Sequence, residues 1–290
     1  MVKKILVSVL LGLAASGPLC ASSIAYERVS FRRLVAHVVT VDLVDPEVKV
    51  SVALAAGGAG RCERFRSMMN RTRPAAAITG TFFDTRSLQP TGDIALFGTL
   101  VHSGCIGSAL CVDSNNKAQI VPLSKGRKTG WTGYETVLCA GPTLVANGKV
   151  GIELKHEGFR RSLMSGSRRT AVGISKTGKL ILVCVNRKSS LYEIAKLMIK
   201  LNARSAVSLD GGSSAALYHQ GGYFAVPGRT LTNCLVVYSS TRAYNRAKTA
   251  LAPARMMAKA APRRLPDSSP IPALLLPPTN VFPFATPAAH

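Results

Sequence analysis

The chain has 290 residues, of which 47% are hydrophobic and 18% charged, and its formal net charge is +23. This length suffices for one large domain with a proper core and leaves little room for a second. The excess of Lys and Arg attracts anionic polymers, phosphorylated glycans or acidic lipids without selecting among them. Specific nucleic-acid binding is disfavoured, because aromatic residues make up only 6% of the chain and no nucleic-acid-binding motif occurs.

Residues 1–21 have the pattern of a cleavable signal peptide. Lys3 and Lys4 precede an apolar stretch over residues 5–15, and Leu19-Cys20-Ala21 offers a cleavage site. The apolar stretch is shorter than the roughly 20 residues that cross a bilayer. We therefore expect a secreted or periplasmic protein without a transmembrane anchor.

Residues 22–240 are predicted to form a single domain of the α/β (mixed α+β) class, with a mixed β-sheet and flanking helices. Two strands are expected over residues 34–43 and 48–54, joined as a hairpin by a turn at Asp45-Pro46. A short helix over residues 61–70 and a strand over residues 75–78 follow.

The clearest helix covers residues 191–201, where apolar residues repeat on one face. Ser190 and Glu193 match a capping box at its start. Strands are expected on both sides, over residues 180–185 and 206–209, so this segment predicts a crossover between parallel strands. Asp210 then follows the carboxyl end of its strand, where open α/β sheets commonly bind ligands.

The segment after that strand reads Asp210-Gly211-Gly212-Ser213-Ser214. A buried strand holds the carboxylate rigidly, and the glycines leave room for a ligand to approach the main chain. The alternative is an ordinary turn in which Asp210 bonds to nearby amides.

Six cysteines remain beyond the leader, and their even number is compatible with disulfides in an oxidising compartment. Cys105 and Cys111 bracket a glycine-containing loop that a disulfide could close, whereas Cys184 lies in an apolar run and is expected to be a small buried residue.

Residues 241–290 are rich in Ala, Pro, Arg and Lys and are predicted to be a basic, mostly disordered tail, with transient helix over residues 246–259.

Several segments together resemble the phosphodiester glycosidase family. The matching segments are Gly80-Thr81-Phe82-Phe83-Asp84, residues 90–98, Gly141-Pro142-Thr143-Leu144-Val145, Arg169-Thr170-Ala171-Val172-Gly173, the Asp210 segment, and Arg229 with Asn233. Two positions depart from the family pattern. Thr79 stands where the family usually has Asn. Ser213-Ser214-Ala215 stands where the family has a third glycine and paired hydroxyls, which leaves Ser214 as the better match to the family hydroxyl.

The resemblance implies hydrolysis at the anomeric carbon of a sugar whose leaving group is a phosphodiester. Such a reaction needs a carboxylate near the developing oxocarbenium charge and a cation for the departing phosphate. We predict Asp210 as nucleophile or general base and Arg169 as the phosphate-binding cation, with Arg229 as the second choice for that role.

The other predicted substrate-binding residues are polar groups and glycines of the same segments. They are Thr79, Asp84, Thr170, Gly211, Gly212, Ser213, Ser214 and Asn233, with Asp84 or Asp93 as a second carboxylate. For Thr170 and Asp84 the alternatives are hydrogen bonding within a strand and capping of a turn. No cofactor is expected, although a divalent cation near Asp210 is compatible with its carboxylate.

The sequence predicts a sugar-phosphate or other anionic glycan as substrate and does not indicate the sugar or the oligomeric state. Two other functions stay open. One is a glycan- or sugar-phosphate-binding protein without turnover, and the other is a basic envelope interaction protein that acts through its charged surface and tail.

Overall fold

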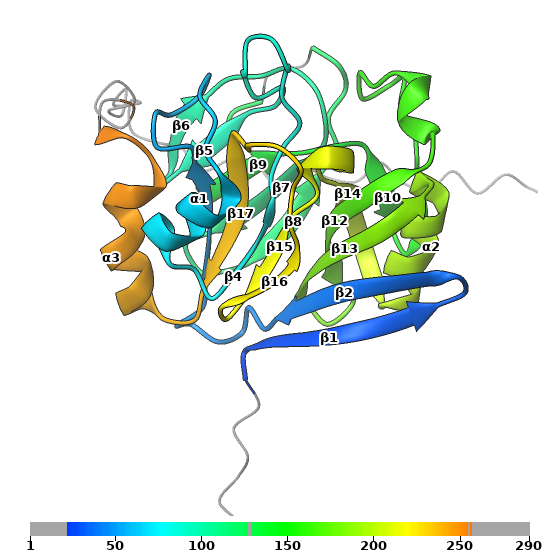
Figure 1. The fold of residues 1–290 in the computed structure, drawn as a ribbon, viewed down its shortest axis with the longest axis horizontal. Helices are drawn as coiled ribbons and strands as arrows, with labels where there is room; N and C mark the ends of the chain where they lie inside the picture. Colours follow the sequence, from blue (N-terminus) through cyan, green and yellow to red (C-terminus); the bar gives the residue numbers. More distant parts are fainter. Residues whose placement is uncertain (1–21, 127–128, 255, 257–290) are drawn as a thin grey trace, which may run out of the picture. The chain divides into compact units, whose positions relative to one another are not determined.

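The computed structural model describes residues 22–126, 129–254 and 256, which form three β-sheets with three α-helices (Figure 1). The predicted signal peptide and residues 257–290 of the predicted tail lie outside the described residues. Within the described part, no helix is long and apolar enough to cross a membrane.

Seven strands form the first sheet, and two further sheets have five strands each. The first sheet has the order β1 (Ile24–Phe31), β2 (Leu34–Val41), β13 (Leu180–Ser189), β12 (Ser167–Ser175), β14 (Ala203–Ser208), β10 (Thr143–Ala146) and β11 (Lys149–Val150). The second is β16 (Gly222–Ala225), β15 (Leu217–His219), β4 (Ala76–Thr79), β17 (Asn233–Tyr238) and β3 (Lys49–Leu54). The third is β6 (Thr99–His102), β5 (Ile94–Leu96), β9 (Tyr134–Cys139), β7 (Ala109–Asp113) and β8 (Ala118–Val121).

The helices are α1 (Phe65–Thr72), α2 (Leu191–Lys200) and α3 (Thr241–Leu251), and two short 3-10 helices, η1 (Arg161–Met164) and η2 (Gly212–Ser214), lie in loops. The predicted mixed α/β class is confirmed. Instead of one mixed sheet there are three, and in the described residues every pairing between named strands is antiparallel.

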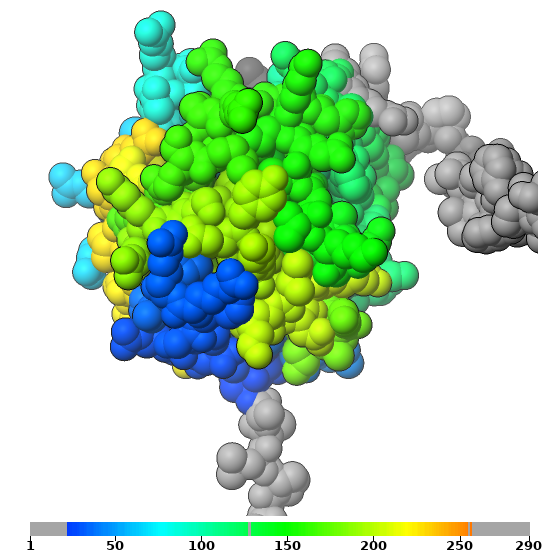
Figure 2. All heavy atoms as spheres, turned by 90° about the vertical axis from the view of Figure 1, so that its right-hand side faces the viewer, coloured from blue at the N-terminus to red at the C-terminus, as the bar shows by residue number. Residues whose placement is uncertain are grey.

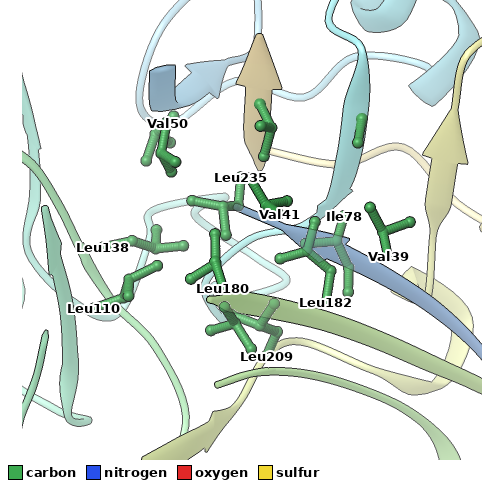
Figure 3. Close-up of a cluster of buried hydrophobic side chains, with 14 of the residues drawn as sticks. Val39, Val41, Val50, Ile78, Leu110, Leu138, Leu180, Leu182, Leu209 and Leu235 are labelled. Carbon is green, nitrogen blue, oxygen red and sulfur yellow. The ribbon is translucent and has the colours of Figure 1, made fainter. Parts of the chain in front are cut away.

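The main core lies where the inner faces of the three sheets meet (Figure 3). Leu182 comes from the first sheet, Ile78 and Leu235 from the second, and Leu110 and Leu138 from the third. All five side chains are fully buried. Burial of each contributes about 1.5–3 kcal/mol, so the contacts among the sheets stabilise the whole domain.

The predicted hairpin between residues 34–43 and 48–54 is wrong. β2 pairs with β1 and β13 in the first sheet, whereas β3 pairs with β17 in the second. Asp45 does form a turn, in which its carbonyl accepts from the amide of Val48. After this turn the chain enters the second sheet. There β3 is buried on both faces, because Val52 lies in the main core and Ala53 packs with residues of α1 and α3.

Helix α2 begins one residue after Ser190, as predicted, and the capping box is present. The Ser190 side chain accepts from the Glu193 amide, and the Glu193 carboxylate accepts from the Ser190 amide.

The predicted crossover between parallel strands is confirmed in part. β13 and β14 run in the same direction, but β12 lies between them and is antiparallel to both. On the face in Figure 2, the blue β1–β2 hairpin lies beside yellow-green α2, where Arg33 forms a salt bridge with Glu193 at 2.7 Å.

Two further expectations change. The boundary of the disordered tail at residue 241 is wrong, because α3 occupies Thr241–Leu251 and buries Tyr244 and Leu251 against the second sheet and α1. The disulfide that would close the Cys105–Cys111 loop is not formed, and all six cysteines of the described residues are free. Cys184 is fully buried, as expected.

The capping box gives a first testable prediction. Ser190→Ala removes the side-chain acceptor for the Glu193 amide and should lower the free energy of unfolding by about 1 kcal/mol. Urea denaturation measures this change. Ser190→Thr, which keeps the hydroxyl oxygen, is the control, and equal losses in the two variants would show that the cap does not stabilise α2.

Candidate functional site

Asp210 lies two residues after the end of β14, at a point where the first and second sheets touch. Its amide donates to the carbonyl of Gly80, just after β4, at 3.0 Å. Its carbonyl accepts from the Thr170 hydroxyl of β12 at 2.5 Å. Asp210 is only 7% exposed. Hydrogen bonds to both sheets therefore fix the backbone that carries the carboxylate, and they assign Thr170 a supporting role.

Opposing effects act on the pKa of the Asp210 carboxyl group. Burial raises its pKa to about 6, while a hydrogen bond from the Ser214 hydroxyl, the charge of Arg229 and the amide of Gly211 act in the other direction. Burial has the larger effect, because moving an ionised carboxylate out of water is costly. A carboxyl group with a pKa near 6 can gain or lose a proton close to neutral pH, as acid–base catalysis requires.

Two glycines shape the turn that follows Asp210. A Cβ on Gly211 would lie 2.5 Å from the carbonyl oxygen of Arg168, and Gly212 has a φ of +56°. Side chains at these positions would clash or force strain, so the motif needs both glycines. The turn leads into η2, where Ser214 is buried and the Ser213 carbonyl accepts from the Gly228 amide at 2.8 Å.

Arg229 is the arginine that the structure brings to Asp210. Its Nε donates to the Ser214 hydroxyl at 2.8 Å, and its guanidinium lies 4.9 Å from the centre of the Phe83 ring. Since Ser214 in turn bonds to the Asp210 carboxylate, the three side chains form a chain of hydrogen bonds. Arg229 is otherwise exposed, so its two terminal nitrogens are accessible to an anion.

Arg169 is not brought to Asp210 in this way. Its side chain is only 4% exposed and donates to the carbonyls of Ser189 at 3.1 Å, of Leu163 at 2.6 Å and of Ser165. Burial lowers its pKa. Neighbouring Arg168 is half-buried and donates to the Ala215 carbonyl at 3.2 Å. The Arg169 guanidinium thus stabilises residues 163–165, before β12, and the end of β13, and its donors are not free to bind an anion at the surface.

Asn233 and Thr79 are buried residues of the second sheet, next to the Gly80 backbone. Asn233 Oδ1 accepts from the Thr81 amide at 2.9 Å, and a Cβ on Gly80 would lie 1.8 Å from that oxygen. Asn233 is 2% exposed and Thr79, on β4, is 1% exposed. Asn233 therefore shapes the Gly80 backbone to which the Asp210 amide binds.

The two candidates for a second carboxylate are engaged elsewhere. Asp84 is exposed and accepts from the amides of Arg86 and Ser87, and these hydrogen bonds lower its pKa. Asp93 accepts from the Gly104 amide at 2.7 Å and from the Trp131 indole at 2.6 Å. Both carboxylates stabilise loops. Asp84 caps a turn, which was the alternative to its role as a second carboxylate.

One buried acid was not predicted from the sequence. Glu157 is 3% exposed and accepts from the amide and hydroxyl of Thr143, the latter at 2.6 Å, and from the Ser108 hydroxyl. It thereby fixes the Gly-Pro-Thr segment that precedes β10. The sequence around Glu157 has no motif that would distinguish it from a surface acid.

The described residues contain no group of three or more His, Cys, Asp or Glu side chains placed to hold a metal ion. The site instead consists of one buried carboxylate, one hydroxyl and one accessible guanidinium. Such a set can stabilise positive charge at one atom and bind an anion beside it.

Comparisons with known proteins place the chain in a family. The family model of the phosphodiester glycosidases matches residues 72–238, more than half of the chain, and spans Asp210, Ser214 and Arg229. No curated protein matches the chain.

Solved structures share the fold. A hypothetical protein from Synechocystis is 16% identical with a TM-score of 0.64 over 74% of this chain, which spans 61% of that protein. The zebrafish N-acetylglucosamine-1-phosphodiester alpha-N-acetylglucosaminidase catalytic domain, auto-inhibited by its pro-peptide, is 22% identical with a TM-score of 0.61, over 77% of this chain and 85% of that one. A putative exported protein from Burkholderia pseudomallei is 16% identical with a TM-score of 0.52, over 71% and 74%.

The different surroundings of the two arginines give a prediction. Arg169→Ala removes a buried side chain and leaves three carbonyls, of which that of Ser189 is buried, without their donor, so it should lower the free energy of unfolding by about 3 kcal/mol. Arg229→Ala removes an exposed side chain and should cost less than about 1 kcal/mol. Urea denaturation of both variants compares them directly, and similar losses would contradict the supporting role of Arg169.

Proposed function

Because this chain belongs to the phosphodiester glycosidase family, we propose that it is a hydrolase that removes a sugar from a glycosyl phosphodiester or a related anionic glycoconjugate. The observation that supports this most is the hydrogen-bonded set of Asp210, Ser214 and Arg229, which places a buried carboxylate beside an accessible cation. The zebrafish structure of the same fold is named for a reaction of this class.

In the proposed reaction the bond between the anomeric carbon and the phosphate oxygen breaks, and the phosphate leaves with the electron pair. Asp210 in its ionised form acts as nucleophile on the anomeric carbon or as the base that takes a proton from the attacking water. Its negative charge also stabilises the oxocarbenium-like transition state. The products are the free sugar and a phosphate monoester.

The departing phosphate is assigned to Arg229. A guanidinium presents paired donors that match phosphate oxygens and stays charged at all relevant pH values. The Ser214 contact holds Nε of Arg229 and leaves the terminal nitrogens for the phosphate. A phosphate monoester is a weakly basic leaving group, so a cation can take the place of a strong general acid. This assignment replaces Arg169, whose donors are bound to carbonyls.

We also propose that the protein is exported and acts on an envelope or extracellular glycoconjugate. The support is the charged and apolar pattern of residues 1–21 and the excess of basic residues, which favours anionic substrates. The Burkholderia structure of the same fold is described as a putative exported protein.

Sugar release from a panel of glycosyl phosphodiesters and nucleotide-sugars tests the proposed function. The wild type should release free sugar, while Asp210→Asn and Arg229→Ala should each lower kcat/KM by at least about 100-fold, because each removes charge stabilisation from the transition state.

The control for this experiment is Lys200→Ala/Arg204→Ala, which removes two exposed charges from the opposite end of β14 and should keep full activity. Saturable binding of the substrates without sugar release would indicate the binding protein instead. Full activity in Asp210→Asn would rule out Asp210 as the reacting carboxylate.

The raised pKa of Asp210 predicts how the rate depends on pH. As nucleophile or base, Asp210 acts only when ionised, so kcat/KM should rise with pH through an apparent pKa of about 6 and level off above it. The pH profile of sugar release measures this. Glu153→Gln, which neutralises an exposed acid, should keep the same profile. A rate that falls through pH 6 would assign Asp210 the role of general acid.

A further inference from the structure

A cavity of about 330 Å³ adjoins the candidate active site, and we call it the arginine pocket (residues 64–66 and 226–230). Arg64 and Arg66, from the start of α1, line it together with Arg229. Val226, which is 50% exposed, and Pro227 add apolar surface. Its volume lies at the lower end of the range for small-molecule sites. None of the proposed catalytic steps uses Arg64 or Arg66.

Backbone hydrogen bonds fix the pocket against the Asp210 turn. The amides and carbonyls of Glu63 and Leu231 bond reciprocally at 2.8 and 2.9 Å, which places the start of α1 beside the segment that carries Arg229. On the other side, the Gly228 amide donates to the carbonyl of Ser213 at 2.8 Å. Arg229 itself both lines the pocket and bonds to Ser214, so the pocket and the reacting carboxylate share one side chain.

Within the described residues, Arg64 and Arg66 have no acidic partner, while the charge of Arg229 acts on the Asp210 carboxylate. No acidic residue lines it, and none of its three arginines forms a salt bridge. Glu63, the nearest acid in sequence, is occupied by Arg71 at 2.5 Å. The guanidinium of Arg66 stacks 4.2 Å above the Tyr223 ring, which orients it. The first turn of α1 has no acid and no side-chain cap.

We propose that the arginine pocket binds a second phosphate group of the substrate, on the aglycone side of the phosphate that leaves the sugar. This inference rests on the proposed function. A single phosphodiester has one negative charge, which Arg229 can bind alone, whereas three guanidinium groups around one pocket suit a second phosphate. The apolar surface of Val226 and Pro227 accommodates carbon atoms of the aglycone. The substrate class is thus a glycosyl ester with at least two phosphates.

Calorimetric titration of the purified protein with inorganic pyrophosphate tests the pocket without turnover. The wild type should bind one pyrophosphate, and Arg64→Ala/Arg66→Ala should bind it at least 10-fold more weakly. The matched control Lys200→Ala/Arg204→Ala loses the same charge and should bind within twofold of the wild type. Arg204 lies six residues before Asp210, or about 20 Å along an extended strand. Equal weakening in both variants, or no binding by the wild type, would overturn the proposal.

Kinetics then identify the source of the second phosphate. Three substrates with the same sugar are compared: a phosphodiester to an uncharged alcohol, a nucleoside diphosphate ester, and a compound with two phosphates separated by a further sugar. Arg64→Ala/Arg66→Ala should lower kcat/KM at least 10-fold more for one of the two-phosphate substrates than for the single phosphodiester. An equal effect on all three substrates would overturn the proposal.

The two proposals fail differently. If the wild type releases no sugar from any substrate, the hydrolase proposal fails, while the pyrophosphate titration still decides whether the pocket binds phosphate. If sugar is released but the variants do not discriminate among the substrates, the hydrolase stands and the second phosphate site does not.

Discussion

The fold depends on how closely three backbones approach one another at the end of β14. The Gly141 amide donates to the Ser208 carbonyl at 2.6 Å, the Leu209 amide to Thr170, and the Asp210 amide to Gly80. A Cβ on Gly141 would lie 2.5 Å from the Ser208 carbonyl oxygen, so only glycine permits this approach. Backbone hydrogen bonds thereby join the first and second sheets at Asp210, and its carboxylate is rigidly placed because both sheets hold its backbone.

Burial of Asp210 is a cost that its neighbours offset only in part. An acid whose pKa is higher in the folded state than in the unfolded chain favours folding at low pH, and this contribution is lost as the pH rises through about 6. Ser214 and Arg229 limit the loss by stabilising the ionised form. The site therefore loses stability at neutral pH while holding a carboxyl group that can gain or lose a proton close to that pH.

Local signals in the sequence predicted local structure well, and contacts between distant segments were the part that failed. The Ser190–Glu193 capping box lies within four residues and was read correctly. Besides neighbouring β1, β2 pairs with β13, where Val39 lies opposite Leu182, and nothing near β2 indicates so distant a strand. The same limit applies to the arginines. Arg169 is part of the recognised motif, but only the tertiary structure shows that its guanidinium binds carbonyls and that Arg229 approaches Asp210 through Ser214.

The unneutralised arginines near the site follow from a general electrostatic constraint. Like charges lining one pocket repel one another, and burial of the Glu63 carboxylate against Arg71 removes the acid that could have neutralised them. The repulsion is tolerable because Arg64, Arg66 and Arg229 are exposed to water, which screens them. An anion that enters such a pocket relieves this repulsion, and under the proposed function that coupling makes substrate charge, rather than shape alone, the property this site selects.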